Sequence, residues 1–196
     1  MIQNFPINSK QIDKINKITA EEKKFRKKNL ELFNEFGFPN KKLEDWKFSD
    51  FKNIVDKNFK KLDIGTVNSI LKKRDILKDF DHNYIFLVNG CLHSSDFKYE
   101  NKNKIKIKSY ERSTNFQTYQ NPLICLNHAL AENGYSLEVD KNYKFKKVLI
   151  IYNIFTKNIK NKILNNKNKI RIGENSEIHT LEYTINESKF KFINNV

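Results

Sequence analysis

The chain has 196 residues and a net charge of +14, with 33 Lys but only 4 Arg. It contains no run of about 18 apolar residues, and its first residues lack the apolar centre of a secretory signal, so we expect neither a membrane-spanning helix nor export. Two cysteines, Cys91 and Cys125, are too few for a disulfide framework, and a cytoplasmic location is the simplest expectation.

The first segment, residues 9–36, is predicted to form a helix with its apolar residues on one face. Thr19 and Glu22 have the spacing of a capping box, in which each side chain satisfies a free backbone N–H of the other residue. Gly37 is a good terminator because it can adopt a left-handed conformation, and Pro39 prevents the helix from continuing. Two further helices are predicted, a short one over residues 49–61 and a weaker one over 66–80.

The character of the chain changes near residue 83. The stretch YIFLVNG predicts a strand followed by an Asn-Gly turn, and the alternation of KIKIKSY predicts a strand over 104–110. One helix interrupts, over residues 121–133, with Asn121 as cap, Pro122 in the first turn and Gly134 as terminator.

After Gly134 the pattern is that of short strands about ten residues apart, which is typical of a sandwich, a barrel or a β-solenoid. The pattern continues to Val196 without a closing helix or cap. If the strands form a β-solenoid, we expect it to be unfinished, and any coding sequence downstream should add more short strands and then helices. Its open end would expose apolar core and unpaired backbone groups and make the chain only marginally stable.

A nucleic-acid-binding protein is the alternative that the positive charge suggests. It predicts a clustered basic face with interleaved aromatic residues and binding that weakens steeply with salt. The abundance of Lys, Asn and Ile is also typical of A/T-rich coding sequence, and the lysines are spread along the whole chain. Nucleic-acid sites favour Arg for bidentate contacts, so we expect no nucleic-acid partner.

No catalytic or metal-binding constellation is visible. The histidines do not have zinc-ligand spacing, Cys91 and His93 would supply only two ligands, and there is no phosphate-binding glycine loop. Glu44 and Asp45 are adjacent and would diverge, which is a poor geometry for acid-base catalysis. We therefore expect no enzyme, no bound cofactor and no metal. The four histidines are His82, His93, His128 and His179.

Asn127 lies within an apolar helical stripe formed by leucines. Its amide would either bond a neighbouring loop or strand edge, or point to solvent, and the sequence does not decide between these two interpretations.

The stretch FGFPNKKLEDWKFSDF, residues 36–51, resembles the N-terminal motif of the SufD family, an iron–sulfur cluster assembly subunit of the SUF system. In that motif a Gly-x-Pro turn precedes a Glu-x-Trp-Lys-aromatic-Ser/Thr segment. Phe48 stands where the family usually has Tyr. The matching residues are Gly37, Pro39, Glu44, Trp46, Lys47, Phe48 and Ser49.

Three further stretches resemble the family in the same order. IFLVNGCL resembles a strand with a Val-Asn-Gly turn, and NKIRIGENSEIHTLEY resembles a strand pair around a glycine turn. LNHALAENGYSLEV resembles a Leu-Asn-x-Ala-Leu segment followed by Gly; its matching residues are Leu126, Asn127, Ala129, Leu130 and Gly134. Together the four stretches favour SufD over its paralogue SufB.

The resemblance implies an α+β chain, with a helical N-terminal domain over residues 1–82. Residues 83–196 would then be the first coils of a right-handed parallel β-helix with the helix 121–133 inserted. It also implies a scaffold subunit that associates with a SufB-like subunit and a SufC-like ATPase. The iron–sulfur cluster would be the product of that complex and not a cofactor of this chain.

The chain resembles only the N-terminal part of the family, and the helices on which the ATPase docks have no counterpart in it. None of the four histidines and neither Cys91 nor Cys125 matches a cluster-related position. The Trp46 stretch is interpreted as a structural join whose indole packs the helical region together.

Overall fold

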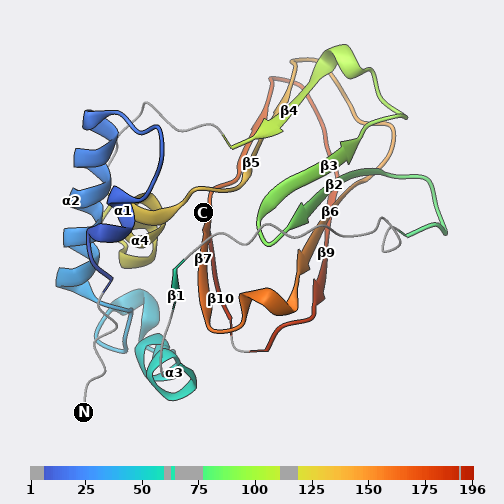
Figure 1. The fold of residues 1–196 in the computed structure, drawn as a ribbon. Coiled ribbons are helices and arrows are strands. Elements are labelled where there is room, and N and C mark those ends of the chain that lie inside the picture. Colours follow the sequence, from blue (N-terminus) through green and yellow to red (C-terminus); the bar gives the residue numbers. More distant parts are fainter. Residues whose placement is uncertain (1–6, 60–62, 65–76, 111–118, 190) are drawn as a thin grey trace.

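The structure is a computed structural model, and it describes all residues except 1–6, 60–62, 65–76, 111–118 and 190. It is a mixed α+β fold, in which helices lie beside several open sheets, none of them closed into a barrel (Figure 1). Within the described residues no helix has the length and apolar content needed to cross a bilayer.

The helix predicted over 9–36 is two helices, α1 (Lys10–Asp13) and α2 (Ala20–Phe36). The break has a local cause. The backbone of Thr19 is extended (φ −70°, ψ 160°), and its hydroxyl accepts a hydrogen bond from the N–H of Glu22 at 3.0 Å. An N-cap residue cannot continue a preceding helix, so the capping signal starts a new one. At the other end Gly37 has φ 69° and donates its N–H to the carbonyl of Phe33.

The second predicted helix is present as α3 (Phe51–Asn58), shorter than the expected 49–61. Asp50 caps it by accepting the N–H of Asn53 at 3.0 Å. A short 3-10 turn, η1 (Glu44–Trp46), precedes it. Most of the helix predicted over 66–80 lies outside the described residues.

The strand predicted in YIFLVNG is β2 (Asn83–Val88), which forms an antiparallel hairpin with β3 (Cys91–Asp96). Asn89 and Gly90 form its turn with positive φ angles of 51° and 83°. This is the backbone geometry for which Asn-Gly is favoured, and the prediction is confirmed.

The strands form three sheets, in the orders β1-β7-β10, β3-β2-β6-β9 and β4-β5-β8 (Figure 1). From β5 onward the chain visits the three sheets in one order and then repeats it: β5, β6, β7, followed by β8, β9, β10. Each strand of the second round pairs in parallel with its counterpart from the first. Two short 3-10 turns connect strands, η3 (Lys102–Lys104) and η4 (Lys157–Ile159). The strands not yet bounded are β1 (Asp63–Ile64), β4 (Ile105–Ser109), β5 (Tyr135–Val139), β6 (Leu149–Phe155), β7 (Lys162–Asn166), β8 (Lys169–Ile172), β9 (Thr180–Asn186) and β10 (Phe192–Asn195).

The helix predicted over 121–133 is α4 (Pro122–Leu130), with the side chain of Asn121 accepting the N–H groups of Leu123 and Ile124. It ends at Leu130, with Ala131 as its C-cap, and does not continue to Gly134, so that part of the prediction is wrong. The backbone of Ala131 is extended, which leads the chain toward β5.

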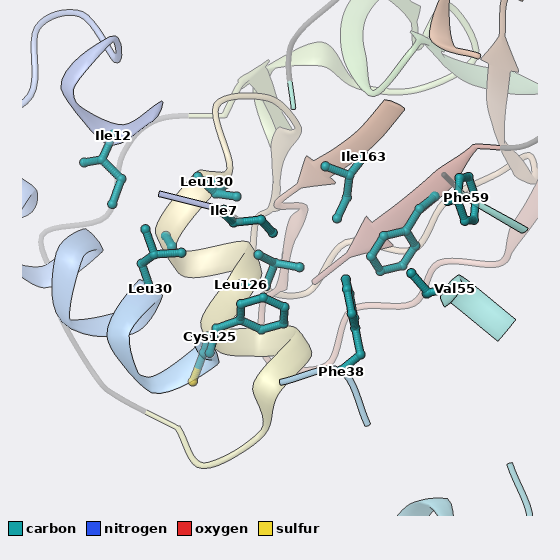
Figure 2. Close-up of a cluster of buried hydrophobic side chains, with 13 residues drawn as sticks. Ile7, Ile12, Leu30, Phe38, Val55, Phe59, Cys125, Leu126, Leu130 and Ile163 are labelled. Carbon is teal, nitrogen blue, oxygen red and sulfur yellow. The ribbon is translucent and has the colours of Figure 1, made fainter. Parts of the chain in front are cut away.

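Helix α4 packs against α2, and one apolar cluster joins the helices to the strands (Figure 2). The cluster takes Leu30 from α2, Val55 from α3, Leu126 from α4 and Ile163 from β7. The hydrophobic core of the helical region therefore continues across residue 82 into the strand region. A second cluster lies between two of the sheets and includes Ile85, Leu137 and Leu149.

Candidate functional site

The Trp46 stretch lies where the helical region meets the strand β10. The indole of Trp46 is half-buried and lies 5.6 Å from the ring of Phe51, which in turn lies 5.3 Å from the ring of Phe192 on β10. The ring of Phe38 lies 6.0 Å from the ring of Phe51 and 5.9 Å from the ring of Phe192. Aromatic pairs at these separations contribute packing energy beyond their buried area, so this stretch joins α3 to β10.

The polar residues of this stretch have local partners. The ammonium of Lys47 lies 2.5 Å from the carboxylate of Glu44, and both side chains are exposed. The carbonyl of Pro39 accepts the N–H of Lys52 at 2.8 Å, which fixes the turn against α3. An exposed ion pair of this kind contributes little to stability, so the packing of the rings is the stronger effect.

A shallow groove of about 360 Å³ lies between this turn and α3. Its lining mixes both signs of charge, and Lys52 is already paired with Asp56 inside it. No single class of charged ligand is favoured there. The lining residues are Asn40, Lys41, Lys42, Asp50, Lys52, Asn53 and Asp56.

Asn127 is fully buried on α4 and bonds two strands at once. Its Nδ2 donates to the carbonyl of Asn166 on β7 at 2.8 Å and to the carbonyl of Asn194 on β10 at 2.9 Å. Of the two interpretations of this residue, the structure supports the bond to a strand. Leu126 and Ala129 are also buried and pack in the shared core.

Two rungs of paired asparagines run between β7 and β10, and the sequence analysis missed them. Asn194 donates to Oδ1 of Asn165 at 2.9 Å, and Asn166 donates to Oδ1 of Asn195 at 3.0 Å. The strands are in register so that ILNN (163–166) lies beside FINN (192–195). This internal repeat of two apolar residues followed by two asparagines was visible in the sequence and indicates stacked parallel strands.

Gly90 and Gly134 lie so close to β7 and the residues after it that a side chain at either position would clash. A Cβ at Gly90 would lie 2.0 Å from Oδ1 of Asn166, and one at Gly134 would lie 1.9 Å from the carbonyl oxygen of Lys167. The glycine at position 134, which the resemblance singles out, therefore allows the chain after α4 to run against the β7–β8 connection.

Arg26 holds the end of α4, another contact that the sequence analysis missed. Its guanidinium donates to the carbonyls of Ala129 and Ala131 at 3.0 and 2.9 Å, and its Nε donates to Glu22 at 2.9 Å. Arg26 and Glu22 are both buried. Carbonyls at a helix C-terminus lack partners within the helix, so a buried guanidinium satisfies them and binds α2 to α4.

His128 is buried beside this contact, with the rings of Phe25 and Tyr119 at 5.5 and 5.4 Å. Its Nδ1 has no hydrogen-bond partner among the described residues. Burial, reinforced by the positive charges of Lys167 and Arg26, lowers the pKa of His128 from 6.5 to about 4. The imidazole is therefore neutral at neutral pH.

Neither cysteine is activated by its surroundings. Cys91 is half-exposed and Cys125 is buried, and burial raises the pKa of each thiol. The described residues contain no group of three or more His, Cys, Asp or Glu side chains placed to hold a metal ion.

Glu100 has a structural role. Its carboxylate accepts hydrogen bonds from the side chains of Asn83 and Tyr143 and from the N–H groups of Lys146 and Lys147. Burial opposes ionisation, but these four donors outweigh it and lower the pKa of Glu100.

The strands β8, β9 and β10 lie at the edges of their three sheets. No strand among the described residues pairs with their outer edges. Ile170 and Ile172 are 43% and 45% exposed, although their partners in register, Leu137 and Val139, are buried. Unpaired edges combined with exposed apolar side chains favour association with another strand. These three edges are the candidate association site.

A comparison of the sequence with models of known protein families finds no match, and a comparison with curated proteins finds none.

Proposed function

We propose that the chain is the N-terminal part of a SufD-like scaffold subunit in iron–sulfur cluster assembly. In this proposal the chain is not an enzyme and binds no cofactor, and it acts by associating with a SufB-like subunit. The cluster is the product of the complex to which it contributes.

The observation that carries the proposal is the repeated order of the sheets. The chain passes through the same three sheets twice, with parallel pairing between the rounds, which is the arrangement expected of the first coils of a parallel β-helix. We propose that the strand region is such a β-helix, right-handed as in the SufD family.

The positions of the two best-matched motifs also support the proposal. Trp46 reaches β10 through the rings of Phe51 and Phe192, and Asn127 bonds the backbones of β7 and β10. Two motifs far apart in the sequence thus both lead to β10, as expected if together they hold the helices against the strands.

The proposed association surface consists of the edges of β8, β9 and β10. Parallel edge strands can pair with strands of a partner, and their exposed apolar side chains would then become buried. The SufC-like ATPase would join through the SufB-like subunit, because the helices on which it docks have no counterpart in this chain.

The test is co-expression of the affinity-tagged chain with a SufB-like subunit and, separately, with a SufC-like ATPase. We expect retention of the SufB-like subunit at low salt and none of the ATPase alone. The variant I170K/I172K should lose the SufB-like subunit, whereas I54K, at an apolar residue 51% exposed on α3, should keep it. If the unmodified chain fails to retain the SufB-like subunit, the proposal is wrong.

A further inference from the structure

The outer face of the sheet β4-β5-β8 carries an ordered set of positive charges. Along β4, Ile105 is buried, whereas Lys106 and Lys108 are exposed on the opposite face. On β8, Lys169 and Arg171 alternate in the same way with the apolar residues of that strand and are exposed. The strict alternation of the two strands therefore places their basic residues together on one surface.

The register of the strands aligns these residues in rows. In the first row, Lys106 on β4 lies opposite Glu138 on β5, which lies opposite Arg171 on β8. In the next row, Lys108 lies opposite Ser136, which lies opposite Lys169. Neighbouring strands lie about 4.8 Å apart, and alternate residues of one strand about 6.7 Å apart. The charges thus form two columns, one along β4 and one along β8.

A further lysine extends the β8 column. The ammonium of Lys167 lies 5.9 Å from the centre of the Tyr110 ring, which follows β4. Tyr110 donates its N–H to the carbonyl of Gly134, so the pairing of β4 with β5 continues to this point. We call the surface formed by Lys106, Lys108, Lys167, Lys169, Arg171 and Glu138 the basic face.

The basic face consists of five basic residues and one acidic residue. Glu138 lies 3.5 Å from Arg171, and it is the only acidic residue among the six. Lys167 is half-buried, and burial together with the charges of Arg26 and Lys169 lowers its pKa. Such crowding is relieved when carboxylates from a partner approach.

We propose that the basic face binds an acidic protein segment in an extended conformation, with carboxylates at alternate positions. An extended segment places alternate side chains about 6.7 Å apart on one side, which matches the spacing of the cations along β4 and along β8. This inference does not rest on the proposed assembly function and goes beyond it.

A nucleic acid fits the same face less well. Glu138 lies between Lys106 and Arg171 and would repel a phosphate backbone. The one arginine of the face is engaged by that carboxylate, and the Tyr110 ring is partly buried beside Lys167. Single-stranded nucleic acids need open aromatic platforms for stacking, and the basic face offers none.

The test uses a fluorescent ten-residue peptide of alternating Glu and Thr, titrated with the full chain at low and at physiological salt. A block peptide of the same composition, with five Glu followed by five Thr, is the control for spacing. We expect the alternating peptide to bind roughly fourfold more tightly, because each additional exposed ion pair gives about a twofold gain. Equal binding of the two peptides would overturn the proposal.

The matched variants are K106Q/K169Q on the basic face and K57Q/K157Q at exposed lysines elsewhere. We expect the first to weaken binding of the alternating peptide about fivefold and the second to leave it unchanged. Equal losses in both variants would indicate attraction by net charge alone and overturn the proposal. An oligothymidine of equal charge that binds more tightly than the peptide would indicate a nucleic-acid surface instead.

Discussion

Asn127 on α4 and Asn194 on β10 each donate a hydrogen bond to the element that carries the other. Nδ2 of Asn127 donates to the carbonyl of Asn194 at 2.9 Å, and Nδ2 of Asn194 donates to the carbonyl of Leu123, one turn earlier on α4, at 2.8 Å. The same amide of Asn127 also bonds the carbonyl of Asn166 on β7. One buried side chain therefore fixes the helix to two neighbouring strands.

Replacing Asn127 with Ala should destabilise the protein by about 1–3 kcal/mol, because two buried hydrogen bonds are lost and each contributes about 0.5–1.5 kcal/mol. The carbonyl of Asn166 still accepts the N–H of Val196 at 3.0 Å, so it is not left without a donor. The measurement is the free energy of unfolding in urea, followed by circular dichroism. The control is N158A, at an exposed asparagine, which should change stability by less than about 0.5 kcal/mol. A loss for N127A as small as that of the control would show that the bonds to β7 and β10 contribute nothing.

Replacing Gly90 with Ala should cost more than replacing Gly37 with Ala. Both glycines have positive φ, 83° and 69°, which costs an alanine about 1–2 kcal/mol. A Cβ at Gly37 meets no atom within 4 Å, whereas one at Gly90 would lie 2.0 Å from the Asn166 side chain. Displacing that asparagine adds about 1–3 kcal/mol. Urea unfolding of the two variants measures the difference, and equal losses would contradict the close packing of Gly90 on the asparagine rungs.

The features predicted correctly from the sequence depend on neighbouring residues. The cap at Thr19 and the turn at Asn89 and Gly90 are set by residues within a few positions, so their signals are readable in one short window. The predicted continuous helix over 9–36 was wrong because apolar periodicity continues on both sides of Thr19, whereas the cap at Thr19 begins a separate helix.

The features missed depend on distant residues. The pairing of β7 with β10 was not predicted, because the asparagines of each strand resemble loop residues until ILNN at 163–166 is placed beside FINN at 192–195. The contact of Arg26 with Ala129 and Ala131 spans more than 100 residues, and no local pattern indicates it. The basic face likewise arises from strand register, since its lysines are separated in the sequence by α4 and the three strands β5, β6 and β7.

Stability should rise with pH between about 4 and 6.5. The pKa of His128 is about 4 in the folded protein and 6.5 as its ordinary value, so the unfolded chain binds more protons in this interval. The contribution is fully present above pH 6.5 and is lost as the pH falls toward 4. It amounts to about 3–4 kcal/mol, because each pKa unit corresponds to about 1.4 kcal/mol.

Urea unfolding at several pH values measures this slope. H128Q removes the titrating group and should flatten the slope. The pKa of Glu100 is lowered from its ordinary value of 4.5, so this residue causes a separate loss of stability as the pH falls below 4.5. Most of the interval assigned to His128 lies above that pH. An unchanged slope in H128Q would show that His128 is not the group responsible.

Removing Arg26 should be the most damaging single change at the contact between α2 and α4. R26M leaves the buried Glu22 carboxylate without its guanidinium and removes the donors of two carbonyls, at Ala129 and Ala131. Breaking a buried ion pair from one side costs about 3–5 kcal/mol. The matched control is K27M on the same helix, where an exposed ammonium 3.5 Å from Asp13 is lost and the expected cost is below about 1 kcal/mol.

A double-mutant cycle with E22Q separates the ion pair from the bonds to α4. In the double variant the carboxylate is neutral, so the charge penalty disappears and only the loss of the two carbonyl contacts remains. We expect a coupling energy of about 1–3 kcal/mol between positions 22 and 26, with the double variant still less stable than the unmodified protein. Strictly additive losses would mean that Arg26 acts on the end of α4 alone and that Glu22 does not stabilise its guanidinium.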